Sequence, residues 1–266
     1  MRTLALLVLV AAASLAAAAP EPKKPATTIT WYGHAAFRIE TPNGKTLLVD
    51  PWLTNPSNPT GKTDVKTVKA DLILVTHGHG DHVGDSNDIA KRTKAKLVAT
   101  YDLGATLVGQ GYPKEQYGME TGGNFGGTLQ LLDGEVAITF VPAVHSSGVG
   151  DVKKEYGGNP GGFVIAIKNG PTLYHTGDTD VFGDMALIGK FAKIDLMLAC
   201  IGGHFTMDPE RAAEATRLVK PKQVAPMHYG TFPALTGTPD AFGKALKKAA
   251  TGVKLVEIKI NQPITL

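Results

Sequence analysis

The most informative part of the chain is Thr76-His77-Gly78-His79-Gly80-Asp81-His82, in which three imidazoles and one carboxylate fall within six consecutive residues. It directly follows the apolar run Asp71-Leu72-Ile73-Leu74-Val75, whose branched side chains predict a buried strand. Four potential metal ligands therefore come directly after a buried strand, where α/β folds commonly place their sites.

The spacing within this segment favours a metal site. His77 and His79 are two residues apart, so both side chains point the same way on an extended backbone. Gly80 lets the chain turn before Asp81 and His82, so one loop can offer two pairs of ligands to two neighbouring ions. Imidazole and carboxylate suit zinc, iron or manganese. The alternative is a solvated polar loop, but three of the chain's eight histidines fall here.

The composition is that of a globular, enzyme-like chain. Of 266 residues, 19% are charged, and 31 glycines and 17 prolines provide many turns, so a disordered or coiled chain is excluded. The length allows one large domain with a substantial core. The net charge is only +3, and the densest basic run, residues 91–96, fits the solvated face of a helix better than a nucleic-acid surface. No nucleic-acid partner is expected.

Residues 1–19 are predicted to be a signal peptide. A short positive start precedes an uncharged apolar run over residues 4–19, which is short for a membrane span and ends in small residues. We expect cleavage after Ala18, and an uncleaved anchor is the alternative. Residues 20–27 form a Pro-rich spacer, and residues 28–266 form one domain. The protein is expected to be periplasmic or secreted, with no membrane contact after cleavage.

Two helices are predicted from their first residues. Asp208 and Thr238 can each cap a helix N-terminus, and each precedes a proline at the first helical position. The first of these helices should stop before Pro221, and a final strand is expected over Leu255–Ile260. The glycine-rich segment 146–162 is predicted to be an irregular loop that serves as a lid or substrate wall.

The pattern His77-x-His79-x-Asp81-His82 resembles the metal-binding motif of the metallo-β-lactamase superfamily. In that family the remaining ligands are a His after a later strand, an Asp in a Gly-Asp turn and a His near the C-terminus. This chain has a candidate for each, in the same order: His145, Asp178 and His228. The resemblance runs from about Ile29 to the end and implies an α/β fold, the αββα sandwich, with two facing sheets, helices outside and the site at one edge.

The same resemblance implies two divalent metal ions. It assigns three ligands to each ion and one bridging ligand: His77, His79 and His145; Asp81, His82 and His228; and Asp178. Zinc is the expected metal, because a chain exported unfolded takes up its metal outside the cytoplasm, and Mn²⁺ or Fe²⁺ is the alternative.

The implied chemistry is hydrolysis. The pKa of water falls from about 15.7 in bulk to about 7 on even one zinc ion. A metal-bridged hydroxide would attack a carbonyl or phosphorus centre, and the metals would stabilise the oxyanion. The expected substrate is a small molecule with an ester, lactone, amide or phosphoester bond. The alternatives are a phosphodiesterase acting on a phospholipid-like or cyclic phosphate, and a non-catalytic metal-binding protein of the same fold.

Three side chains are predicted to take part in catalysis: Asp81, which is also a predicted ligand, His34 and His204. His34 lies at a turn between two early strands, and the resemblance implies a hydrogen-bond donor or proton shuttle there, with a structural role as the alternative. His204 follows a predicted strand on the same side as the ligands and could face the substrate. Asp50 closes an early strand and could hold a ligand histidine in its tautomer, or be a simple turn residue.

Differences between this chain and several branches of the superfamily limit the range of expected substrates. No second helical domain is evident, which disfavours a glutathione thioester, and no inserted nuclease domain or basic face is evident, which disfavours RNA. No flavodoxin-like extension is evident, and Asp81-His82 together with His79 favours hydrolysis over oxygen reduction by a di-iron site. What remains resembles the small metal-dependent hydrolase branch that includes ascorbate-6-phosphate lactonases. The sequence indicates no particular oligomeric state.

Overall fold

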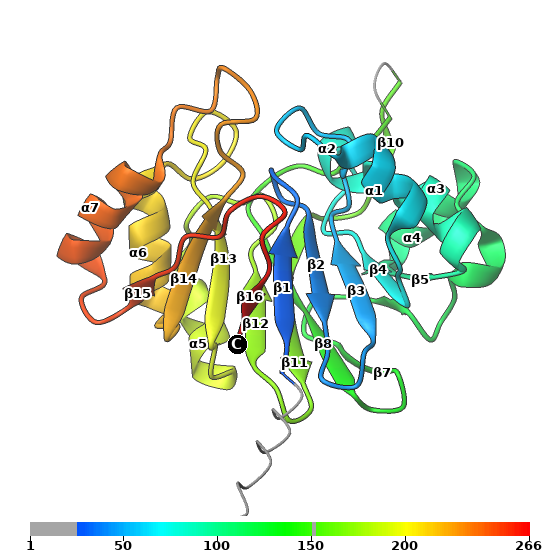
Figure 1. The fold of residues 1–266 in the computed structure, drawn as a ribbon, viewed down its shortest axis with the longest axis horizontal. Helices are drawn as coiled ribbons and strands as arrows, with labels where there is room; N and C mark the ends of the chain where they lie inside the picture. The colour runs from blue at the N-terminus through cyan, green and yellow to red at the C-terminus, as the bar shows by residue number, and fades with distance from the viewer. Residues whose placement is uncertain (1–25, 151–152) are drawn as a thin grey trace, which may run out of the picture.

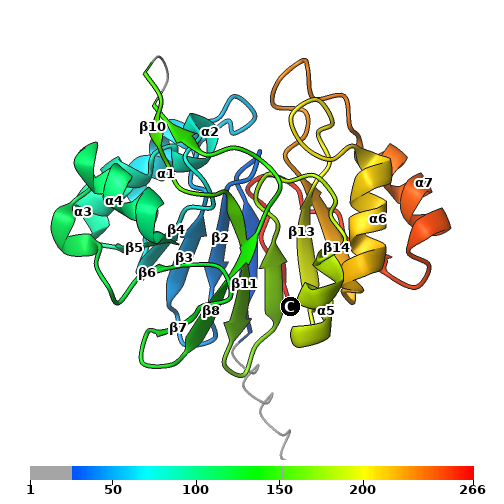
Figure 2. The same cartoon turned by 180° about the vertical axis from the view of Figure 1, so that it is seen from behind.

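The computed structural model describes residues 26–150 and 153–266. The predicted signal peptide, residues 1–19, and most of the predicted spacer, residues 20–27, lie outside the described residues. Within those ranges the strands form two seven-stranded sheets and one two-stranded hairpin. The two large sheets face each other and helices cover their outer sides, as Figures 1 and 2 show. This arrangement is the αββα sandwich that the sequence predicted.

The first sheet is antiparallel at one edge and parallel at the other. Its strands, in spatial order, are β16 (Ile264–Thr265), β1 (Thr28–Trp31), β2 (Phe37–Glu40), β3 (Thr46–Val49), β4 (Leu72–Leu74), β5 (Lys96–Thr100) and β6 (Gly122–Gly123). The helical segments on this side are α1 (Gly61–Thr67), α2 (Gly80–Val83), α3 (Ser86–Thr93), α4 (Tyr101–Gly109) and the short 3₁₀ helix η1 (Lys114–Gln116).

The second sheet mixes both pairings as well, with its parallel part at the β15 edge. Its strands, in spatial order, are β15 (Lys254–Leu255), β14 (Gln223–Met227), β13 (Leu196–Cys200), β12 (Thr172–His175), β11 (Gly161–Ile167), β8 (Val136–Pro142) and β7 (Thr128–Leu131). The helices on this side are α5 (Met185–Phe191), α6 (Pro209–Val219) and α7 (Pro239–Ala249).

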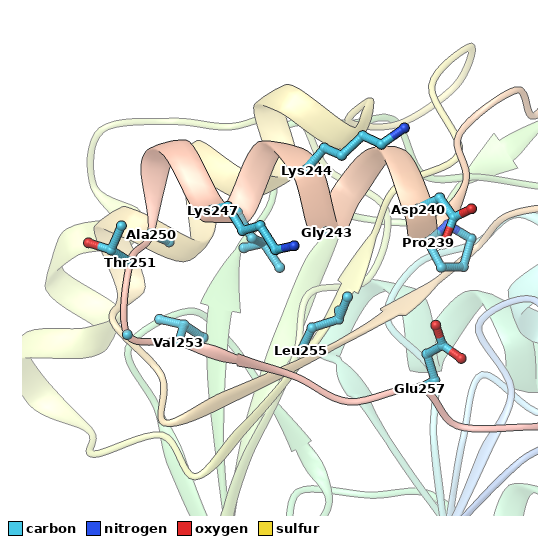
Figure 3. Close-up of a pocket in the computed structure, with 12 residues that line it drawn as sticks. Pro239, Asp240, Gly243, Lys244, Lys247, Ala250, Thr251, Val253, Leu255 and Glu257 are labelled. Atoms are coloured by element: carbon cyan, nitrogen blue, oxygen red, sulfur yellow. The ribbon is translucent and has the colours of Figure 1, made fainter.

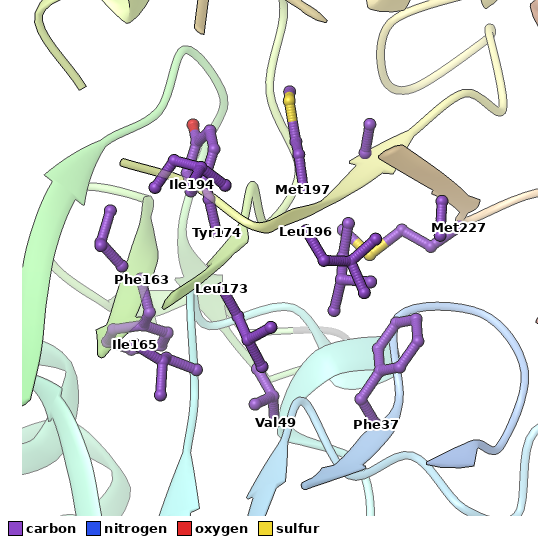
Figure 4. Packing of buried hydrophobic residues seen from close by; sticks show 14 of the residues in the cluster. Phe37, Val49, Phe163, Ile165, Leu173, Tyr174, Ile194, Leu196, Met197 and Met227 are labelled. Atoms are coloured by element: carbon purple, nitrogen blue, oxygen red, sulfur yellow. The ribbon is translucent and has the colours of Figure 1, made fainter. Parts of the chain in front are cut away.

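The interior between the sheets is filled by large apolar side chains. Phe37 and Val49 of the first sheet belong to the same buried cluster as Phe163, Leu173 and Leu196 of the second (Figure 4). Each such side chain stabilises the fold by about 1.5–3 kcal/mol when it is fully buried. A separate cluster lies between the first sheet and its helices. The central strands are therefore covered on both faces, which explains their continuous apolar sequences.

The two capped helices are confirmed. α6 begins at Pro209 and ends at Val219, and the backbone N–H of Arg211 donates to the side chain of Asp208. α7 begins at Pro239, and the Thr238 hydroxyl accepts from the backbone N–H of Ala241. Among the described residues, no helix combines the length and the apolar character that crossing a membrane requires.

The predicted final strand over Leu255–Ile260 is wrong. Only Lys254–Leu255 pairs with the second sheet, and the chain then crosses to the first sheet, where Ile260 bridges to Trp31 and β16 pairs with β1. Because this segment spans two sheets, it extends regular pairing with neither, although its apolar residues pack on both.

The predicted irregular loop over residues 146–162 is partly wrong. It contains a hairpin of β9 (Gly148–Val149) and β10 (Glu155–Tyr156), and its last residues already belong to β11. The hairpin packs on the metal-binding loop, because the Ser147 hydroxyl accepts from the backbone N–H of Gly78 at 3.0 Å and donates to the carbonyl of Gly157 at 2.7 Å.

Candidate metal centre

The predicted ligands follow strands of both sheets that end at one edge of the sandwich. The loop after β4 carries His77, His79, Asp81 and His82, and His145, Asp178 and His228 follow β8, β12 and β14. β3 and β4 run parallel, as do β12, β13 and β14. All seven side chains occur in clusters whose candidate ligand atoms lie within 4.8 Å of one another.

The first cluster consists of His77, His79 and His145. The Nε2 atom of His77 lies 3.0 Å from Nδ1 of His79, and Nε2 of His145 lies 3.3 Å from the same Nδ1 atom. Burial lowers the pKa of His77 and of His145, so these imidazoles stay neutral, which is the form that binds metals. This is the group of three that the resemblance assigned to one ion.

The second cluster consists of Asp81, His82 and His228, joined by His34. The Nε2 atom of His228 lies 4.0 Å from Oδ2 of Asp81. The rings of His82 and His228 are stacked, with centroids 5.5 Å apart. The geometry therefore reproduces the second predicted group and adds one histidine to it.

Asp178 lies between the two clusters. Its Oδ1 atom is 3.2 Å from Nε2 of His82, and its Oδ2 atom is 3.0 Å from Nε2 of His228 and 3.6 Å from Nε2 of His145. One buried carboxylate thus contacts members of both groups, as expected for a bridging ligand.

These residues fit metal ions because their buried polar atoms face one another. Within residues 26–150 and 153–266, Nε2 of His82, Nε2 of His228 and Oδ1 of Asp178 have no hydrogen-bond partner, and the histidine atoms instead lie against the Asp178 carboxylate. A buried polar atom without a hydrogen bond costs about 1–3 kcal/mol, a cost that a cation would remove. Burial would lower the pKa of His82, but Asp178 and Asp50 on either side raise it well above its ordinary value. Positive charge is therefore favoured here, and a divalent cation would provide it.

Asp50 orients the predicted ligand His82 from the side of the ring opposite Asp178. Its Oδ2 atom lies 2.8 Å from Nδ1 of His82, and its carboxylate also accepts from the N–H and hydroxyl of Thr76 at 2.8 and 2.7 Å. Because a carboxylate can only accept here, Nδ1 of His82 carries a proton, and Nε2 is the nitrogen that would bind a cation. The orienting role considered from the sequence is thus supported by contacts, and the residue closes a turn as well.

Of the two histidines predicted to take part in catalysis, only His34 contacts a predicted ligand. Its ring is fully buried, and Nε2 lies 3.1 Å from Oδ2 of Asp81. Burial lowers the pKa of His34 to about 4, against the opposing effect of Asp81. His204 is exposed, lies edge-on to Phe205 at 4.4 Å, and belongs to neither candidate cluster.

Three residues of the site adopt left-handed backbone conformations although they are not glycines. The φ angles are 52° at His34, 45° at Asp50 and 56° at His228. Such conformations cost about 1–3 kcal/mol each and persist where the surrounding structure imposes them, often at functional sites. Each residue ends a strand or joins two, so the strained turn aims its side chain along the sheet edge.

The sequence did not indicate two aromatic residues beside the second cluster. Trp52 and Phe232 are partly buried and stacked, with ring centroids 5.7 Å apart, and each lies edge-on to His34, at 5.3 and 5.6 Å. Trp52 lies two residues after Asp50, and this closeness to a candidate site residue could have indicated it from the sequence. Phe232 belongs to an irregular segment with no periodicity, so no local signal could have placed it.

Surface hollows elsewhere do not coincide with this centre. One lies between α7 and the chain that follows it, and its lining includes Lys244, Lys247, Asp240 and Glu257 (Figure 3). None of the predicted ligands contributes to it. The His/Asp cluster therefore remains the candidate site.

An αββα sandwich with such a cluster at one edge of its sheets defines a class of metal-dependent hydrolases. The chain belongs to the metallo-β-lactamase superfamily: the Beta-lactamase superfamily domain matches residues 28–228. The chain is accordingly a metal-dependent hydrolase of this superfamily.

Relatives with known sequences and structures agree with this assignment. A UPF0173 metal-dependent hydrolase of Thermodesulfovibrio yellowstonii is 60% identical over 247 residues, which is 91% of this chain and 92% of that protein. The solved structure of Igni18, a metallo hydrolase of Ignicoccus hospitalis, is 36% identical, with a TM-score of 0.78 over 90% of this chain and 98% of that one. YhfI of Bacillus subtilis, a metallo-β-lactamase fold protein, is 14% identical and shares the fold, with a TM-score of 0.67 over 91% of this chain and all of that one.

Proposed function

We propose that the protein hydrolyses a small molecule with the help of two divalent cations, zinc being the expected metal. The observation that carries this proposal is the position of Asp178, whose carboxylate contacts His82 through Oδ1 and both His228 and His145 through Oδ2. A carboxylate shared by two groups of ligands suits a pair of cations, because one ligand can then serve both ions.

The exposure of the ligands indicates that a substrate would approach from the side of His79, Asp81 and His145. His77, His82, Asp178 and His228 are buried, whereas His79, Asp81 and His145 are partly exposed. When bound, such cations acidify a water molecule and stabilise the oxygen that becomes anionic. The chain's own residues hold the ions, exclude bulk water on the buried side and leave the other side open to a substrate.

The bond proposed to be cleaved is an ester, lactone, amide or phosphoester. Trp52 and Phe232 offer a partly exposed apolar wall near the second cluster, which suits the apolar portion of a small molecule. The Ser146 hydroxyl is 3.3 Å from Nε2 of His79 and is exposed, so it can hydrogen-bond a polar group of the same substrate.

A substrate panel tests this function. Metal-loaded protein is assayed on generic lactones, carboxylic esters, amides and phosphodiesters, with His79→Ala as the ligand variant and Lys248→Ala, at an exposed position of α7, as the control. We expect turnover on at least one carbonyl or phosphoester class, which His79→Ala abolishes and Lys248→Ala retains. Turnover confined to phosphodiesters would favour the phosphodiesterase alternative. Two bound metals without turnover on any class would favour a non-catalytic metal-binding protein.

We also propose export of the chain, because the apolar run that ends at Ala19 has the composition of a signal peptide. Expression in a bacterium with a periplasm, followed by mass spectrometry of the mature N-terminus, tests it. A mature chain that starts at Ala19 is expected, and an intact N-terminus in the cytoplasmic fraction would refute export.

A further inference from the structure

The side chain of His34 is held in place from several directions. It lies in the turn between β1 and β2, at a φ angle of 52°. Its backbone carbonyl accepts from the backbone N–H of His228 at 2.9 Å and from Nε1 of Trp31 at 3.0 Å. The ring packs on the ring of His228 with a centroid separation of 3.8 Å. Such a ring has little freedom to move during a reaction.

Both ring nitrogens of His34 are engaged. Nε2 lies 3.1 Å from Oδ2 of Asp81, and Nδ1 lies 3.0 Å from the hydroxyl of Thr231. The Asp81 carboxylate accepts, so Nε2 carries the proton, and Nδ1 accepts from Thr231. His34 therefore has no lone pair left for a metal ion, and its ring is fully buried, away from a substrate.

Asp81 needs such support more than its neighbours do. Its side chain is 27% exposed, whereas those of His82 and His228 are 0% and 1% exposed. Within the described part of the chain, His34 provides the one hydrogen bond found to the Asp81 carboxylate. That bond keeps Oδ2 on the inner side, 4.0 Å from Nε2 of His228. Without it, the carboxylate could rotate into solvent, where it would be well hydrated.

We propose that His34 is a positioning residue for the second cation, acting through Asp81, and that Thr231 orients the His34 ring for this task. The proposal rests on the proposed dinuclear function, because Asp81 must share an ion with His82 and His228. It differs from a proton shuttle, since His34 touches a ligand carboxylate and not the reacting atoms.

Two substitutions of His34 separate positioning from a merely structural role. His34→Gln places an amide N–H where Nε2 of the ring stands, so it can still donate to Asp81. His34→Asn reaches only as far as Nδ1, so it keeps a partner for Thr231 and loses Asp81. Asn tolerates a left-handed φ better than Gln does. A structural role therefore predicts that Asn is the milder change, and positioning predicts the opposite for metal binding.

The measurement is the number of bound ions and their affinities, from elemental analysis of zinc-loaded protein dialysed against increasing chelator. Loss of a supporting hydrogen bond of this kind weakens metal binding about 10- to 100-fold. We expect His34→Asn to bind the second ion that much more weakly and to keep its affinity for the first ion. We expect His34→Gln to bind both ions with near wild-type affinity. His204→Asn is the matched control and should bind both ions normally. Thermal unfolding of each metal-free variant checks the fold.

The results that overturn the proposal are distinct from those that overturn the function. His34→Asn with a normal second ion, or equal losses in the Asn and Gln variants, would refute positioning. If His34→Asn does not fold, Thr231→Val replaces it in the test. Thr231→Val should lower the affinity for the second ion by a smaller factor, and an unchanged affinity would contradict the proposal. A wild-type protein that binds only one ion would refute the dinuclear centre itself.

Discussion

Replacing Asp50 by Asn should weaken metal binding and leave the metal-free protein nearly as stable as the wild type. The Asp50 carboxylate is fully buried and accepts from Nδ1 of His82 and from the N–H and hydroxyl of Thr76. Asn keeps one oxygen for the Thr76 N–H but turns an N–H₂ group toward His82. The stable arrangement then has Nδ1 of His82 accepting, which moves the proton to Nε2.

The magnitude follows from that change of tautomer. Nε2 of His82 is the atom that faces Asp178 at 3.2 Å, so a cation there needs the tautomer with its proton on Nδ1, which the Asp50 carboxylate stabilises and an amide N–H₂ does not. Loss of a supporting partner of a ligand histidine weakens metal binding about 10- to 100-fold, which corresponds to about 1.4–2.7 kcal/mol. The metal-free protein should keep most of its stability, because the amide still fills the site and still makes hydrogen bonds.

Competition with a chromophoric chelator measures the affinity of each ion in Asp50→Asn. Asp71→Asn is the matched control, because Asp71 is also a strand-flanking aspartate that accepts a backbone N–H, from Thr46 at 2.8 Å, but at the start of β4. We expect wild-type affinities in the control and a weakened second ion in Asp50→Asn. Unchanged binding in Asp50→Asn would refute the tautomer argument.

Further predictions concern the site and the core. Removal of metal with a chelator should lower the unfolding temperature, because ions that bind only the folded state stabilise it, and an unchanged temperature in calorimetry would argue against a cation in this cluster. Phe232→Ala should raise KM more than it lowers kcat, since the Phe232 ring packs on Trp52 and His34, neither of which is a predicted metal ligand; a fall in kcat alone in steady-state kinetics would contradict the wall assignment. Leu196→Ala, in the interior between the sheets, should lower the free energy of unfolding in urea by about 2–5 kcal/mol without changing the metal content. A loss below about 1 kcal/mol would mean that neighbouring side chains fill the cavity.

The predictions that held are those with a local physical signature. The apolar run before Thr76 forms the buried strand β4 over Leu72–Leu74, and the caps at Asp208 and Thr238 act on backbone groups three residues away. The helices α1 and α5, neither of which has a side-chain cap, were not predicted. The failed strand at Leu255–Ile260 had apolar side chains but no single sheet to pair with.

The sequence by itself indicated a metal site after a buried strand, and its resemblance to the superfamily implied the seven candidate ligands and the αββα sandwich. Only the tertiary structure decided between the alternatives left open for Asp50 and His34, by placing Asp50 against His82 and His34 against Asp81, and only it brought Thr231 to the ring of His34. The physical reason is distance along the chain, since Thr231 meets His34 across 197 residues. A hydrogen bond of that kind leaves no periodicity or spacing in the sequence, and it exists only once both sheets have packed.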